Sequence, residues 1–279
     1  MKKIMFFMVA ALAWVVTACS EDEAVINNNE NMITELSLSI EGSDARMAYE
    51  ATDAGLKFAW EDGDKVYVFL AEAGQQTALA FTYSSSTKTF TNNGIGLEAG
   101  KKYYAVYGNS QTGDKYNVGG VSAALTLSSP NSLNNLPMVS DIFTATAGGT
   151  FSTLHHTCGV VEIPFTGTGT LTEVQFNFFG STGSIFPCGD FTVSFSDDKV
   201  GAITRKNTTP YIYEYTNYST PLALSSTPQS LFIPLLPGTY DNVIIFNENG
   251  FGDKLAEGLS VTVERGKVHK KATAINVGQ

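Results

Sequence analysis

Cysteine and histidine are the side chains of this sequence best suited to nucleophilic, redox or metal chemistry. The chain holds three of each, at Cys19, Cys158, Cys188, His155, His156 and His269. Cys19 belongs to the leader described below, so Cys158 and Cys188 form an even pair. Such a pair in an exported chain predicts a disulfide. Two apolar-flanked cysteines can also lie apart as small core residues, and both interpretations stay open.

The histidines do not form a metal-binding pattern. His155 and His156 are adjacent, so on a strand their side chains point to opposite faces. Two histidines four apart on a helix could share a metal, and these cannot. His269 lies among lysines near the end. No zinc-protease, nucleophile-elbow or P-loop motif is present. We therefore expect no metal site, no cofactor and no enzyme activity.

Paired carboxylates are another route to catalysis, because a glycosidase needs two of them ~5–9.5 Å apart. Most acidic residues of the chain instead fall in expected turns, where Asp is favoured for backbone reasons. The segments 61–64 and 247–250 also lack the calcium-loop spacing. The candidate carboxylates, most of which fall in these turns, are Glu61, Asp62, Asp64, Asp190, Asp197, Asp198, Glu248 and Asp253.

Three tyrosines alternate with other residues, at Tyr211, Tyr213 and Tyr215. On a strand their rings share one face and could stack on sugar rings, which would make the protein a glycan-binding lipoprotein. The other interpretation is a sandwich strand built from good β-formers, with the hydroxyl groups reaching water. We favour the second interpretation and keep the first as the alternative function.

The first residues describe an export leader. Lys2 and Lys3 precede an apolar run, Ile4–Val16, that is too short to span a membrane. Val16-Thr17-Ala18-Cys19 resembles the lipobox of bacterial lipoproteins, in which the cysteine is acylated and becomes the N-terminus. This predicts a signal peptide over 1–18 and a lipid-anchored tether over 19–33. The acidic residues 20–23 resemble the tag that exports Bacteroidetes lipoproteins, so we expect an outer-membrane protein exposed at the cell surface.

The charge of the chain excludes some partners. The formal net charge is −10, and loss of Lys2 and Lys3 with the leader makes it −12. Such a surface repels nucleic acid and anionic lipid. We therefore expect contact with a membrane only through the lipid anchor.

The body of the chain is a series of short alternating segments. Leu36, Leu38 and Ile40 alternate with polar residues, which is typical of a half-buried strand. Asp62-Gly63 predicts a hairpin between the segments 56–60 and 65–70. Similar strands recur to the C-terminus, and turn residues separate them. The pattern predicts an all-β chain of two tandem β-sandwich domains, 34–148 and 149–279.

Several motifs together resemble the Bacteroidetes fimbrillin-like surface lipoproteins. They are Trp60–Val66, Tyr103–Tyr107, Leu154–Gly159, Leu236–Tyr240 and Glu264–Val268, which span nearly the whole mature chain. Gly108 stands where the family usually has proline. The resemblance implies two transthyretin-like domains and a role as a pilus subunit or adhesin. Its partners would be other pilus subunits or ligands on host or bacterial surfaces.

The resemblance also implies a maturation site at Arg46. Related fimbrillins are cut after a basic residue that follows their first strand, here residues 34–41. That strand then leaves, and a donor strand from the next subunit fills the groove by β-augmentation. The C-terminal stretch Lys271–Val277 would be the donor. The alternative is that Arg46 is an ordinary surface residue.

Overall fold

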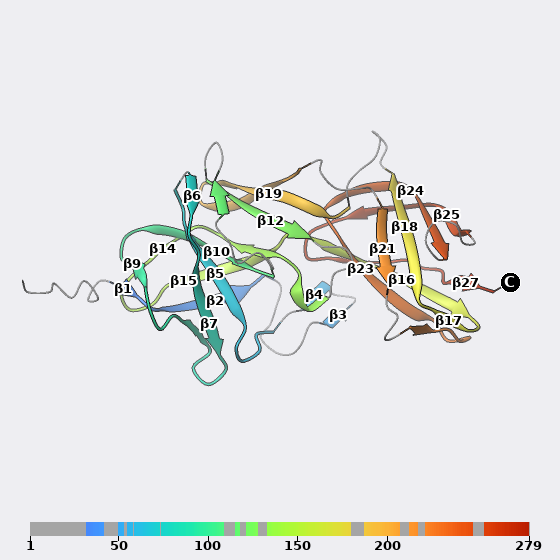
Figure 1. Cartoon of the computed structure of the whole chain (residues 1–279), viewed down its shortest axis with the longest axis horizontal. Helices are drawn as coiled ribbons and strands as arrows, with labels where there is room; N and C mark the ends of the chain where they lie inside the picture. Colours follow the sequence, from blue (N-terminus) through green and yellow to red (C-terminus); the bar gives the residue numbers. More distant parts are fainter. Residues whose placement is uncertain are drawn as a thin grey trace, which may run out of the picture. The chain divides into compact units, whose positions relative to one another are not determined.

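The computed structural model describes residues 32–41, 50–52, 55–57, 59–72, 74–108, 115–117, 121–127, 133–179, 187–206, 212–216, 221–247 and 254–278. In this part of the chain the elements are β-strands and one short 3-10 helix, η2 (Leu133–Asn135), without an α-helix. Figure 1 shows these strands arranged in several sheets. The predicted all-β class is confirmed. No helix of the described residues is long and apolar enough to cross a membrane.

The largest sheet contains eight strands. In spatial order they are β13 (Met138–Ser140), β15 (Phe151–His156), β2 (Glu35–Ile40), β8 (Thr89–Thr91), β7 (Leu79–Ser84), β5 (Lys65–Leu70), β10 (Lys102–Tyr107) and β14 (Phe143–Thr144). β13 pairs with β15 on one side and with β10 on the other. The sheet therefore closes on itself, which removes most of its free edges.

The inside of this closed sheet is a hydrophobic core of its own, which includes Leu36, Val66, Phe81 and Phe90. Trp60 packs against it, with its ring 4.7 Å from the ring of Phe90 in an edge-to-face arrangement. These residues come from alternating positions, because a strand directs successive side chains to opposite faces. The alternation seen in the sequence is thus the direct cause of this core.

A three-stranded sheet shares a second core with the outer face of β5 and β10. Its order is β12 (Ser122–Leu127), β19 (Gly189–Ser196) and β20 (Lys199–Arg205), and β12 lies beside β19 in Figure 1. The strand β10 is buried on both faces, so its burial does not alternate. Tyr103 lies in the first core and its neighbour Tyr104 lies in the second.

Two four-stranded sheets form the C-terminal part. One joins β23 (Gln229–Leu235), β16 (Gly159–Gly167), β26 (Val268–Lys270) and β27 (Ile275–Val277). The other has the order β21 (Ile212–Thr216), β18 (Glu173–Phe179), β24 (Gly238–Asn247) and β25 (Lys254–Val263). Short pairs complete the fold: β1 (Met32–Ile33) with β9 (Leu97–Glu98), β3 (Glu50–Thr52) with β4 (Gly55–Lys57), β6 (Gly74–Gln76) with β11 (Lys115–Asn117), and β17 (Thr170–Leu171) with β22 (Leu222–Ala223).

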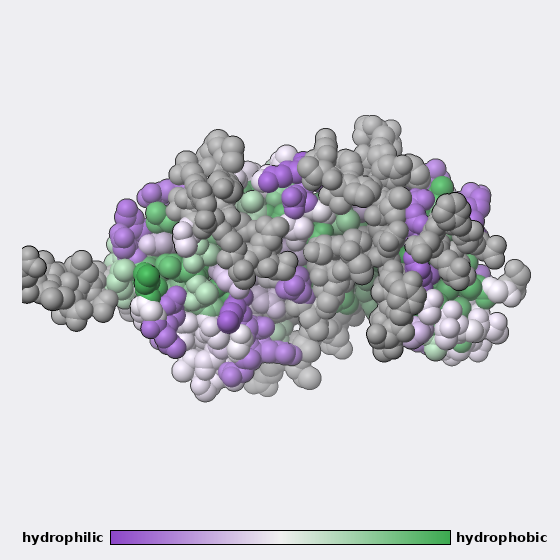
Figure 2. Space-filling view, in the orientation of Figure 1, coloured by the Kyte–Doolittle hydropathy of each residue, from purple (hydrophilic) through white to green (hydrophobic). Residues whose placement is uncertain are grey.

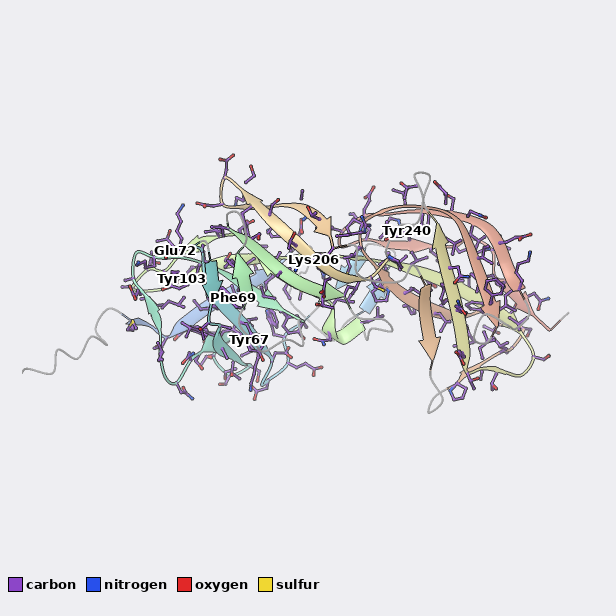
Figure 3. The ribbon with its side chains drawn as sticks, turned by 45° about the horizontal axis from the view of Figure 1, so that its top comes forward. Tyr67, Phe69, Glu72, Tyr103, Lys206 and Tyr240 are labelled. Carbon is purple, nitrogen blue, oxygen red and sulfur yellow. The ribbon has the colours of Figure 1, made fainter. Side chains whose placement is uncertain are left out.

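Strand pairing crosses the predicted domain boundary near residue 148. β15 follows that position yet pairs with β2 and β13 of the first sheet. β12 precedes it yet pairs with β19. One continuous core includes both Phe69 and Tyr240, which are labelled in Figure 3. Residues 31–279 accordingly form one compact unit, and the division into two domains stays a prediction.

The prediction that the segments 56–60 and 65–70 pair as a hairpin around Asp62-Gly63 is wrong. β4 pairs with β3, whereas β5 pairs with β7 and β10. The turn itself is present, because the Asp64 amide donates to the Glu61 carbonyl at 3.0 Å. Asp62 then accepts bonds from the amide and hydroxyl of Ser85 at the end of β7. The turn residues therefore hold β5 against a strand further along the chain.

Candidate functional site

β2 and the groove it fills are the candidate assembly site. Leu36, Leu38 and Ile40 are 0%, 9% and 6% exposed and point into the closed sheet. β2 runs parallel to β15 over four residue pairs, whereas its ladder to β8 covers only Glu35 and Leu36. Removal of β2 would therefore expose an apolar groove and leave one edge of β15 unpaired.

Contacts outside the two ladders also hold β2. The amides of Ser37 and Glu41 donate to Thr150 and Leu154 carbonyls at 2.9 and 2.8 Å. The indole N–H of Trp60 donates to the carbonyl oxygen of Leu38 at 3.3 Å. The tryptophan of the family-like motif thus has a structural role, since it joins the core of the closed sheet to β2.

The C-terminal stretch proposed as donor is already paired in this structure. Ile275 lies opposite Phe165 in the parallel pair of β27 with β16, and it is 5% exposed. A donor role would require β27 to leave β16 and to bury the same apolar residues in a neighbouring subunit.

Several predicted site residues lie outside the described part of the chain. These are Cys19, Arg46 and Tyr211, so lipidation, maturation cleavage and this part of the aromatic face stay predictions. Tyr213 and Tyr215 lie on β21, opposite Phe176 and Val174 of β18. The strand they were expected to form is present, and glycan stacking on it stays a prediction.

The two remaining cysteines are free thiols in the structure. Cys158 and Cys188 are buried in the same hydrophobic core, at 0% and 3% exposed. Burial raises the pKa of the Cys158 thiol to about 12, which makes it a poor nucleophile. The structure therefore agrees with the interpretation as core residues, and a disulfide stays a prediction.

The adjacent histidines take different environments, as their alternation predicted. The ring of His155 lies 2.9 Å from Glu41 and 3.2 Å from Asp141. His156 is 2% exposed, and neither ring nitrogen has a hydrogen-bond partner among the described residues. Burial lowers its pKa to about 4, although the charge of Glu41 opposes this shift. Among the described residues no group of three metal-binding side chains occurs.

Asp141 is an anchoring residue that the sequence pattern did not reveal. Its carboxylate lies 2.9 Å from the Lys199 ammonium and accepts the Val200 amide at 3.0 Å. Partial burial raises its pKa, but the bonds from Lys199, Val200 and His155 lower it further, so the net shift is downward. Asp141 therefore ties β20 to the first sheet as a carboxylate.

Asp197 and Asp198 form the turn between β19 and β20, and both have positive φ. The turn that was predicted for them is present. Asp198 also contacts the first sheet, because its carbonyl accepts the Ile142 amide and its carboxylate lies 2.6 Å from Lys102. The Asp198 carboxylate therefore has a structural role, because it joins this turn to the first sheet.

The described surface includes one mainly apolar hollow and one mainly polar hollow that could hold a ligand. The first, of about 490 Å³, has mainly apolar walls from β16, β23, β24 and β25 and lies beside β26. The second, of about 700 Å³, is mainly polar and lies along β2, β15 and the segment 141–146. Figure 2 shows that hydrophobic residues reach the visible surface as patches among hydrophilic ones. Two large hydrophobic side chains of the described part are exposed: Ile95 at 66% and Phe151 at 75%.

Comparison with known proteins shows similarity of fold. Neither known family models nor curated protein sequences match the chain. A solved Bacteroides ovatus structure, provisionally assigned to cell adhesion, has a TM-score of 0.50 and 12% identity, over 86% of this chain and 91% of that one. A fimbrial protein of the same species has a TM-score of 0.36 and 13% identity, over 88% and 50%. A Bacteroides eggerthii protein, also provisionally assigned to cell adhesion, has a TM-score of 0.36 and 15% identity, over 86% of this chain and 85% of that one.

These identities permit a comparison of fold alone, and the first structure carries it. The fold is of the β-rich class seen in this solved Bacteroides ovatus protein. The predicted resemblance to fimbrillin-like surface proteins is confirmed at this level.

Proposed function

We propose that this chain is a non-enzymatic, lipid-anchored surface protein that acts as a fimbrillin-like pilus subunit or adhesin. Two features support the proposal: the fold shared with a Bacteroides protein provisionally assigned to cell adhesion, and the predicted leader over 1–18 that precedes Cys19. Its location would be the outer membrane, and its partners would be other subunits or ligands on host and bacterial surfaces.

Assembly by donor-strand exchange is the mechanism we propose for the subunit role. The observation that supports it is the burial of β2 in a groove of the closed sheet, followed in sequence by Arg46. Cleavage after Arg46 would separate β2 from the body of the chain. A strand from another copy could then pair with β15 and place alternate side chains in the emptied groove.

The energy of the groove favours a replacement strand. Burial of an aliphatic side chain contributes ~1.5–3 kcal/mol. The three inward residues of β2 therefore contribute roughly 5–9 kcal/mol. This is comparable with the whole stability of a typical domain, ~5–15 kcal/mol. A chain that loses β2 should be stable only when another strand takes its place.

An arginine-specific protease tests the assembly mechanism. Mild treatment of the folded protein should cut after Arg46, release β2 and produce SDS-resistant oligomers. Arg265, which lies in the exposed turn after β25, is a competing site. Mass spectrometry of the fragments distinguishes the two cuts. The variants Arg46→Gln and Arg265→Gln are matched controls, and only the first should abolish oligomers. A cut chain that stays monomeric would contradict donor-strand exchange and leave the anchored adhesin role.

A further inference from the structure

We propose that the polar hollow beside Phe151 is a carbohydrate-binding site, which takes a sugar ring against the phenyl group and its hydroxyls against the polar wall. Phe151 is the first residue of β15, and its side chain is 75% exposed. An exposed aromatic ring at the mouth of a polar hollow of about 700 Å³ is the observation that carries the proposal.

One side of the exposed phenyl ring lies against the backbone of Gly149. A methyl group built on Gly149 would lie 3.1 Å from ring carbon Cε2, so the ring lies directly over this glycine. Gly149 has a φ of +137°, a conformation that favours glycine. Gly149 therefore covers one side of the ring, and the rest of the ring is open to solvent. An aromatic face of this kind attracts the slightly positive C–H groups of a sugar ring.

The wall next to the ring is rich in hydroxyl groups. Three serines, three threonines and two lysines line the hollow. Strand register places Phe151 opposite Ser37 and Thr153 opposite Ser39, all on the outer face of the sheet. The hydroxyls of Ser39 and Thr153 lie 2.9 Å apart. Each hydroxyl can both donate and accept, which matches the vicinal hydroxyls of a sugar.

An ion pair, between Asp141 and Lys199, forms part of the lining of the hollow. Asp141 is 14% exposed and is fixed by Lys199 and by the Val200 amide. The Lys199 side chain is 74% exposed, and an ammonium carries three donors, so it can donate beyond its bond to Asp141. Lys88 adds a second positive group at the rim. The two lysines permit either a neutral sugar or one that carries a carboxylate.

Other ligand classes fit this hollow less well. A protein partner would favour an apolar centre, whereas most residues that line this hollow are polar. Nucleic acid is disfavoured by the net charge of −10. Its volume of about 700 Å³ is within the range of small-ligand pockets. The many hydroxyl groups of its lining suit a hydroxyl-rich ligand. The proposal deepens the adhesin role and rests on it, but it is independent of strand exchange.

Affinity electrophoresis of the full chain tests the site. The probes are native gels that contain dextran, amylopectin, mucin, chondroitin sulfate or polygalacturonate, which cover neutral and acidic sugars. We expect retardation in at least one gel. Phe151→Ala should weaken binding about tenfold, as truncation of an aromatic anchor does. Phe151→Trp should keep the retardation, because it keeps an aromatic face.

Ile95→Ala is the matched control, since Ile95 is the other large hydrophobic residue exposed in the described part of the chain and does not line the hollow. Tyr213→Ala tests the alternative aromatic face on β21. No retardation in any gel, or retardation that Phe151→Ala leaves unchanged, would overturn the proposal. Retardation lost only with Tyr213→Ala would assign sugar binding to β21 instead. The protease assay for oligomers is a separate measurement. It tests strand exchange, so a failure of strand exchange can be told apart from a failure of sugar binding.

Discussion

Acidification should destabilise this protein through His156. The ring is 2% exposed, and both nitrogens are without a hydrogen-bond partner in the described part of the chain. Protonation would place an uncompensated charge in the core, which is why burial lowers the pKa to about 4. An unfolded histidine has a pKa of ~6.5, so the unfolded chain binds the proton more tightly.

The sign and size of the effect follow from this difference. The stability contributed by neutral His156 is complete above pH ~6.5 and is lost as the pH falls toward 4. Each pKa unit corresponds to ~1.4 kcal/mol, so the full loss is roughly 3 kcal/mol. About 2 kcal/mol of it should be lost by pH 5, before most carboxylates titrate.

Urea unfolding at pH 7.5 and pH 5.0 measures this loss. His156→Leu should remove about 2 kcal/mol of the difference between the two pH values, because leucine does not titrate. His269→Gln is the control, since its ring is only partly buried and accepts a bond from the Glu264 amide. An equal pH dependence in wild type and His156→Leu would refute the reasoning.

Four further outcomes are expected. Leu36→Ala should lower the free energy of unfolding by ~2–5 kcal/mol in urea titrations, because the side chain is fully buried. Gly167→Ala should destabilise more than Gly63→Ala, since a methyl group at Gly167 would overlap the backbone carbonyl oxygen of Val277, while Gly63 faces open space. The Cys19→Ser variant should be absent from the membrane fraction or remain unprocessed. Normal processing of this variant with membrane retention would contradict lipidation. In the folded protein the buried thiols of Cys158 and Cys188 should not be alkylated. In urea without reductant, alkylation of both would identify them as free core residues, and alkylation of neither would identify a disulfide.

Local pattern predicted much of the fold. The alternation of Leu36, Leu38 and Ile40 placed β2 with its buried face, because side chains on a strand alternate strictly. The adjacency of His155 and His156 predicted their separation to two faces for the same reason. The turn at Asp62-Gly63 was also predicted, since glycine accepts positive φ there.

Pairing between strands could not be predicted in the same way. The sequence suggested that β5 pairs with the segment before it, but β5 pairs with β7 and β10. Period and turn chemistry are local, whereas a partner is chosen by the fit of side chains that are distant in sequence. The crossing of the predicted boundary by β12 and β15 has the same origin.

The sequence by itself determined the class of the chain and the inward face of β2, because composition and period act over a few residues. Only the tertiary structure decided that Phe151, in an alternating strand like many core residues, has its ring in water. Only the tertiary structure joined Asp141 to Lys199 across 58 positions of sequence and placed both in the lining of the polar hollow. Whether a side chain belongs to a site depends on which residues lie next to it in the folded chain. The spacing of residues along one strand does not specify those neighbours.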